Sequence, residues 1–175
     1  MNDHASDQAD RDLMAAMTQA FAAEGWEPGA LLPAHMPRCF GCGHDNPHGI
    51  GIRVHVAEDP DAVTCEHVFD HRHQGAPGVA HGGAVAAAVD DLFGFVLVRV
   101  LTPAVTRDLA LTYRLPVRLR IPTRLDARLI DRAERDLHMQ ATVTQDDVVV
   151  VTAHATFVEV DMEHLAAPAA RFGLT

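Results

Sequence analysis

The pattern with the clearest chemical content is a glycine pair followed by a carboxylate inside an apolar segment. His81-Gly82-Gly83 precedes a long run of Ala, Val, Leu and Phe in which Asp90 stands. Glycines at a helix start leave the first backbone N–H groups, which have no intrahelical acceptor, open to a ligand. Such donors can stabilise the negative charge that develops on a carbonyl oxygen. A tight turn before a closely packed helix is the more common reason for a glycine pair.

Asp90 is the second part of this pattern. It stands in an apolar segment with alanines and Val89 before it and Leu92 and Phe93 after it. A buried carboxylate without a partner is costly, and low-dielectric surroundings raise its pKa and make it a better base or nucleophile. A structural carboxylate bonded to the next strand is the alternative. The neighbouring Asp91 points about 100° away around a helix, and we expect it to be the solvated or capping member of the pair.

Cys39 and Cys42, with His44 and His48 nearby, raise the question of a metal site. A C-x₂-C pair supplies one half of many structural zinc sites. No second C-x₂-C or H-x₃₋₅-H follows at the usual spacing, which argues against zinc. A redox pair is expected between a strand and a helix, and this pattern is not found around Cys39 and Cys42. We therefore expect a Gly-rich turn with buried thiols and neither a metal nor a cofactor. Zinc and a redox pair remain as alternatives.

Composition narrows the class of protein. The chain has 175 residues and a formal net charge of −10, which argues against nucleic-acid or anionic-membrane partners. The three cysteines are too few for a disulfide framework, so a cytoplasmic location is expected. The acidic N-terminus does not resemble a signal peptide. The longest apolar run, residues 84–101, is interrupted by Asp90, Asp91 and Arg99, so no membrane span is expected.

The elements that would position these residues can be read from the periodicity of apolar side chains. Two helices are expected, an amphipathic one over residues 6–24 and an apolar one over about 81–101, with loops over 39–49 and 70–80. Strands are expected near residues 50–56, 63–69, 109–115, 125–129, 137–143 and 148–160. Short links between the later strands require an antiparallel meander. A helix without a polar face must be surrounded, so we expect an α+β hot-dog fold in which a curved antiparallel sheet wraps the apolar helix.

The predicted organisation has three parts. Residues 1–37 form an N-terminal helix and connector, residues 38–161 the hot-dog domain, and residues 162–175 a C-terminal tail. The length fits a single domain with a sizeable core.

Three separated motifs of this chain resemble those of the PaaI-like hot-dog thioesterases, over roughly residues 38–160. Around the apolar helix the matching residues are His73-Gln74-Gly75, Pro77-Gly78, His81-Gly82-Gly83 and Asp90-Asp91. Before the first strand they are Cys39-Phe40-Gly41-Cys42-Gly43, Asn46-Pro47 and Gly49, and after the helix they are Thr106, Leu109, Tyr113 and Pro116. Their common order along the chain makes the resemblance specific.

The resemblance implies an acyl-CoA thioesterase, a hydrolase that releases free acid and coenzyme A. By this match Asp90 activates water or attacks the thioester, and the N–H of Gly82, supported by Gly83, polarises the carbonyl. His81 orients the loop and the substrate, and Thr106 supplies a hydroxyl near the carboxylate. The implied substrate-binding residues are Asn46, His73, Gln74 and Gly75.

The resemblance also implies an acyl-CoA partner and an assembly of several chains. Asp90 lies eight residues after Gly82, about 12 Å along one helix, so one chain cannot bring both to the same carbonyl. A homodimer is therefore expected to build the active site, with a homotetramer as a further step. Seven of the 14 cations fall between Arg114 and Arg135. They are expected on a solvent face, with contacts to coenzyme A phosphates as the alternative.

A non-catalytic acyl-CoA-binding or ligand-sensing hot-dog protein is the chief alternative function, because one fold serves both purposes. Asp90 favours the enzyme, since a binder needs no carboxylate beside a thioester. No helix-turn-helix pattern indicates a DNA-binding sensor, and the His and Asp pair of a hot-dog hydratase is not found.

Overall fold

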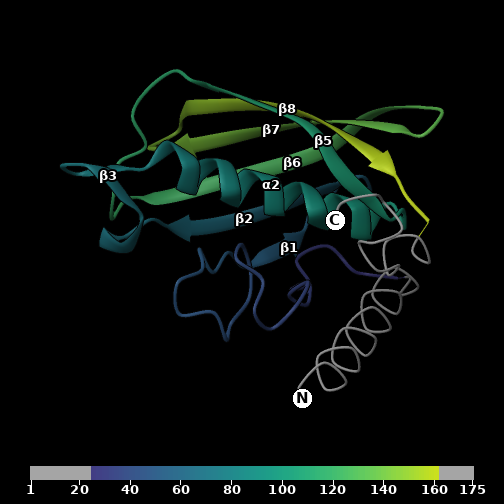
Figure 1. Ribbon diagram of the computed structural model, residues 1–175, viewed down its shortest axis with the longest axis horizontal. Helices are drawn as coiled ribbons and strands as arrows, with labels where there is room; N and C mark the ends of the chain where they lie inside the picture. The colour runs from purple at the N-terminus through teal and green to yellow at the C-terminus, as the bar shows by residue number, and fades with distance from the viewer. Residues whose placement is uncertain (1–24, 162–175) are drawn as a thin grey trace, which may run out of the picture.

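A six-stranded antiparallel sheet and one long helix dominate the computed structural model, which describes residues 25–161 (Figure 1). The sheet contains β1 (Val54–Val56), β2 (Ala62–Val68), β5 (Ala104–Tyr113), β6 (Pro122–Ala133), β7 (Asp136–Gln145) and β8 (Val148–Glu159). The helix is α2 (Gly82–Arg99), and a short 3-10 turn, η1 (His71–His73), precedes the small hairpin of β3 (Gln74–Ala76) and β4 (Val79–Ala80). The helix predicted at 6–24 and the tail at 162–175 lie outside the described residues.

The sheet has the order β1-β2-β6-β7-β8-β5, and all its neighbouring strands are antiparallel. The turn between β7 and β8 has Asp146 and Asp147 at positive φ, 49° and 61°. Two successive left-handed residues make the tight hairpin turn that matches the twist of the flanking strands. The expected antiparallel meander is thus confirmed for β6, β7 and β8. β5 pairs with β8 and forms the edge of the sheet.

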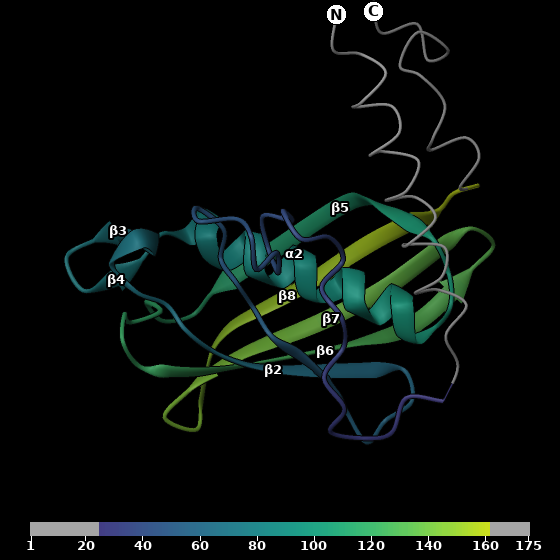
Figure 2. The same cartoon turned by 90° about the horizontal axis from the view of Figure 1, so that it is seen from below.

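The concave face of the sheet packs on α2, as Figures 1 and 2 show. Alternate residues of the strands point at the helix and are almost fully buried, among them Leu125, Leu137, Met139, Val143 and Val151. From the helix, Val85, Val89, Leu92, Phe93 and Val96 complete this core. The predicted hot-dog fold is confirmed.

The segment before β1, residues 25–53 and here called the connector, covers part of the helix that the sheet leaves open. In Figure 2 the chain before β1 crosses α2 on the side away from the strands. Gly41 lies so close to α2 that a Cβ there would fall 2.1 Å from the Asp91 carboxyl carbon. The helix is apolar on all sides because the sheet packs on one side of it and the connector packs on the other.

Two elements differ from the sequence-based expectation. The strand expected over residues 50–56 is reduced to β1, although Ile50 and Ile52 are buried as its alternation predicted. The loop expected over residues 70–80 contains η1 and the β3–β4 hairpin, which its His, Gly and Pro content concealed. Among the described residues, no helix combines the length and hydropathy that a membrane span requires.

Candidate functional site

The start of α2 has the geometry expected of a donor site. His81 is the N-cap, with an extended backbone, and its Nδ1 accepts a hydrogen bond of 2.9 Å from the N–H of Gly83. Gly82 and Gly83 are both exposed. The Tyr113 hydroxyl donates to the carbonyl oxygen of Gly82 at 2.6 Å and ties β5 to this first turn. Because His81 already uses the Gly83 N–H, the Gly82 N–H is the glycine donor left for a ligand.

Asp90 lies eight residues further along the helix, facing β5. Its Oδ1 accepts a hydrogen bond of 3.0 Å from the Thr106 hydroxyl. Asp90 is half-buried and Thr106 is exposed, so the expected fully apolar setting of Asp90 is wrong. The carboxylate is oriented by one hydroxyl and remains accessible to a substrate.

The buried member of the pair is Asp91, and its expected solvation is wrong. The Asp91 side chain is only 12% exposed and contacts His35 and Cys39. Its Oδ1 lies 3.2 Å from His35 Nδ1 and 3.1 Å from Cys39 Sγ. Burial raises the pKa of the Asp91 carboxyl above its ordinary value. The connector, which the helical periodicity cannot reveal, is what buries this side chain.

Cys42 joins the same cluster. The sulfur and nitrogen ligand atoms of His35, Cys39 and Cys42 and a carboxylate oxygen of Asp91 all lie within 4.8 Å of one another. The Cys42 thiol donates to Cys39, and this hydrogen bond lowers the Cys39 pKa to about 3 and raises that of Cys42. Burial opposes protonation of His35, yet Asp91 and Cys39 raise its pKa to about 9.

The premise that C-x₂-C lacks a second half-site is therefore wrong. His35 stands four residues before Cys39, and Asp91 comes from α2. The spacing H-x₃-C-x₂-C was the available signal for the first three residues, while Asp91 could be found only from the tertiary structure. Cys65 is buried in β2 and is not one of the four residues of the cluster.

The predicted substrate-binding residues fall in two different places. His73 is 5% exposed, and its Nδ1 accepts from the Asp70 N–H while its carbonyl accepts from the His81 N–H. Gln74 and Gly75 are exposed on β3. A Cβ on Gly75 would lie 2.7 Å from the His81 Cα, so glycine allows the hairpin to approach the helix start.

Asn46 stabilises its own loop. Its amide nitrogen donates to the Arg38 carbonyl at 3.2 Å, and its Oδ1 accepts from the His48 N–H at 3.0 Å. The structure thus accounts for Asn46 and His73 by contacts within the chain, whereas Gln74 remains available at the surface.

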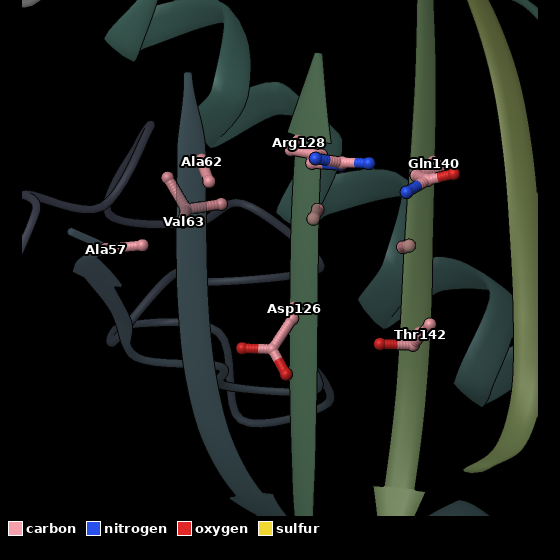
Figure 3. Close-up of a pocket in the computed structure, with 9 residues that line it drawn as sticks. Ala57, Ala62, Val63, Asp126, Arg128, Gln140 and Thr142 are labelled. Carbon is pink, nitrogen blue, oxygen red and sulfur yellow. The ribbon is translucent and has the colours of Figure 1, made fainter. Parts of the chain in front are cut away.

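A groove beside the helix start offers room for a ligand. It has a volume of about 310 Å³, and Gly82, Tyr113, Leu115, Pro116 and Val117 contribute to its walls. A second pocket lies far from this region, between β2, β6 and β7 (Figure 3). Its polar residues Asp126 and Thr142 lie on the sheet face opposite α2, since their neighbours Leu125 and Ala141 are buried against the helix. Neither Asp90 nor Gly82 lines that second pocket.

Several arginines of the predicted Arg-rich run are held in ion pairs on the solvent face. Arg124 pairs with Asp126, and Arg132 pairs with Glu159 at 3.0 Å. This agrees with the solvent-face interpretation for these two residues. Arg114 is exposed beside the groove at Gly82.

The comparisons with known proteins agree with this architecture. Residues 77–152 match the family model of the thioesterase superfamily. No sequence among curated proteins matches the chain significantly. A crystal structure of a thioesterase superfamily protein superposes with a TM-score of 0.65 at 21% identity, over 79% of this chain and 67% of that one.

Two further solved structures resemble the chain in fold. A mutant of the phenylacetic acid degradation protein PaaI from Thermus thermophilus gives a TM-score of 0.57 at 20% identity, over 63% of this chain and 95% of that one. A Streptococcus mutans protein bound to acetyl-CoA gives 0.55 at 22% identity, over 57% of this chain and 82% of that one. Residues 77–152 thus match the thioesterase superfamily that the sequence motifs indicated, and the chain has the hot-dog fold.

Proposed function

We propose that the protein hydrolyses acyl-CoA thioesters to a free acid and coenzyme A. The single observation that carries this proposal is the accessible carboxylate of Asp90, oriented by the Thr106 hydroxyl at 3.0 Å. The exposed helix start at Gly82, beside a groove, supplies a backbone N–H that can stabilise the oxyanion of acyl transfer. Structures of superfamily proteins with coenzyme A or acetyl-CoA bound support the choice of ligand.

In this proposal Asp90 acts as a general base or as a nucleophile. As a base, its carboxylate takes a proton from water while the water oxygen bonds to the thioester carbon. The carbonyl oxygen becomes an oxyanion that accepts a hydrogen bond from the Gly82 N–H of a second subunit, because the Gly82 of the same helix lies about 12 Å from Asp90. Collapse of this intermediate breaks the C–S bond, and the departing thiolate takes the proton from Asp90. As a nucleophile, Asp90 would attack the thioester carbon and expel the coenzyme A thiolate. The resulting anhydride would then be hydrolysed by water.

The positioning residues support these two groups. Thr106 fixes one carboxylate oxygen of Asp90 and leaves the other for the reaction. His81 accepts the Gly83 N–H and Tyr113 donates to the Gly82 carbonyl, so both contacts hold the peptide between Gly82 and Gly83, which follows the one that carries the Gly82 N–H. The oxyanion role is accordingly proposed for Gly82 alone, with Gly83 as part of the cap.

The function is tested by following thiol release from a panel of acyl-CoAs, from acetyl to long-chain and aromatic acyl groups. We expect multiple turnovers with at least one class, at rates that scale with protein concentration. A parallel binding measurement with the non-hydrolysable thioether analogues separates the two candidate functions. Tight binding of an analogue without thiol release from its thioester would identify a binding protein and contradict the enzyme.

Loss of the Thr106 hydroxyl is expected to impair turnover. Thr106→Val removes the hydrogen bond to Asp90 and keeps the shape of the side chain, so kcat should fall by about 10-fold, the effect of losing one hydrogen bond to a charged group. Thr106→Ser retains a hydroxyl and should remain closer to the wild-type kcat. Equal rates for the two variants, measured at saturating acyl-CoA, would show that this hydrogen bond has no part in catalysis.

A further inference from the structure

A cluster of four potential metal ligands lies outside the proposed active site. His35, Cys39 and Cys42 come from the connector, and Asp91 comes from α2. Their ligand atoms lie within 4.8 Å of one another, although His35 and Asp91 are 56 residues apart in the sequence. The proposed reaction uses none of these side chains.

The spacing of the ligand atoms fits one tetrahedral ion. Zinc bonds of about 2.0–2.3 Å place neighbouring ligand atoms of a tetrahedron about 3.3–3.8 Å apart. His35 Nδ1 lies 3.5 Å from Cys42 Sγ and 3.2 Å from Asp91 Oδ1, and Asp91 Oδ1 lies 3.1 Å from Cys39 Sγ. Since all pairs lie within 4.8 Å, shifts of up to about 1 Å would convert this hydrogen-bonded cluster into a coordination shell.

We propose that His35, Cys39, Cys42 and Asp91 bind one zinc ion as a structural site. Two thiolates and an imidazole favour zinc over magnesium or calcium, which prefer oxygen ligands. Four protein ligands fill a tetrahedral shell and leave no position for substrate, which is the arrangement of a structural rather than a catalytic zinc site.

The surroundings of the cluster support an ion at its centre. Asp91 Oδ2 is buried and has no hydrogen-bond partner within residues 25–161. A divalent cation would compensate this carboxylate and the adjacent thiol groups, which are costly to ionise together in a buried place. The backbone N–H of His35 donates to Cys42 Sγ at 3.3 Å, and such a hydrogen bond would stabilise the negative charge of a thiolate ligand.

Glycines allow the four ligands to converge. A Cβ at Gly41 would lie 2.1 Å from the Asp91 carboxyl carbon, and a Cβ at Gly94 would lie 2.8 Å from His35 Cε1. A Cβ at Gly43 would lie 2.4 Å from the backbone nitrogen of Cys39. Contacts below 3.0 Å require the neighbouring atoms to move, so Gly41 and Gly94 allow the connector to approach α2, and Gly43 allows the turn that follows Cys39.

The consequence for the molecule is mechanical. The ion would fasten the connector to α2 at Asp91, the residue next to Asp90. The connector is joined to β1 by backbone hydrogen bonds such as that from the Leu32 N–H to the Val54 carbonyl, and the ion would add a second link, to the open side of the helix. Zinc would thus act on stability and on the orientation of α2, with no direct part in the chemistry.

The test begins with the wild-type protein, purified with a reducing agent and without chelator. Elemental analysis should find about one zinc per chain. After removal of zinc, titration with Co²⁺ should give the intense visible bands of a four-coordinate site and a thiolate-to-metal charge-transfer band. A folded wild-type protein that holds no zinc and gives no such spectrum overturns the proposal. Iron at one per chain in place of zinc, or a Cys39–Cys42 disulfide in the metal-free protein, also overturns it.

Matched variants separate the ligands from the other thiol. Cys42→Ser and Asp91→Asn should each lower zinc content at least several-fold and weaken the Co²⁺ bands, whereas Cys65→Ser should retain both. Asp91→Asn preserves the side-chain shape and covers the case in which the buried Cys42 variant does not fold. Full zinc content in folded Asp91→Asn and in folded Cys39→Ser would contradict the assigned ligand set. Chelation should lower the Tm of the wild-type protein and leave that of the metal-free variants unchanged.

Discussion

Replacing Asp90 by Asn is expected to lower kcat for acyl-CoA hydrolysis by at least about 10²-fold, because the amide can neither accept a proton from water nor attack the thioester. The amide oxygen can still accept the Thr106 hydroxyl, so the geometry of the site should be preserved. The measurement is kcat at saturating acyl-CoA, with circular dichroism and thermal melting to establish that the variant is folded.

The neighbouring Asp91 provides the decisive control. It lies one position further along α2 and contacts His35 and Cys39. Asp91→Asn should reduce stability and metal content, while the loss of kcat per folded molecule should be far smaller than for Asp90→Asn. Asp108→Asn, an exposed carboxylate on β5, is a second control. Near-normal hydrolysis by Asp90→Asn, or an equal loss in folded Asp91→Asn, would contradict the assignment of Asp90.

The sequence predicted the elements that depend on local pattern. The apolar run beginning at His81-Gly82-Gly83 placed α2 closely, and alternation placed the long strands and the buried positions Val63 and Cys65 of β2. The resemblance to known motifs implied that the Thr106 hydroxyl lies near Asp90, and the two are hydrogen-bonded in the structure. These features are encoded by residues close together in the chain or by motifs in a fixed order.

The features that the sequence did not predict depend on contacts between distant segments. Asp90 and Asp91 stand in the same apolar run, so periodicity could not show that the connector covers Asp91 and leaves Asp90 accessible. His35 meets Asp91 across 56 residues, and no local spacing reports that contact. Burial at this point is set by which segment covers each side of the helix, which is a tertiary property.

A two-chain active site is the second prediction with a large effect. Asp90 lies eight residues after Gly82, about 12 Å along α2. The thioester carbonyl must lie within about 3 Å of both its donor and its attacking group. One helix cannot satisfy both distances, so we propose that the Gly82 N–H of one subunit faces Asp90 of the other in a homodimer. Two such dimers could then associate without changing the site.

Mixing two inactive variants tests this arrangement. Gly82→Pro removes the donor, and the structure accommodates it, because Gly82 is the first helical residue and the extended backbone of His81 suits a following proline. Gly82→Ala keeps the N–H and should lose far less activity than Gly82→Pro. Gly82→Pro and Asp90→Asn are unfolded and refolded together, and native mass spectrometry measures the mixed dimers.

Each mixed dimer would contain one intact site and one site with both defects. With random pairing, activity should return to about one quarter of the wild-type value per chain, since half of the dimers are mixed and half of their sites are intact. The recovered activity should rise in proportion to the mixed-dimer fraction. If both variants fold and exchange subunits while the mixture stays inactive, donor and carboxylate do not come from different chains. Full activity in a monomeric wild-type protein would lead to the same conclusion.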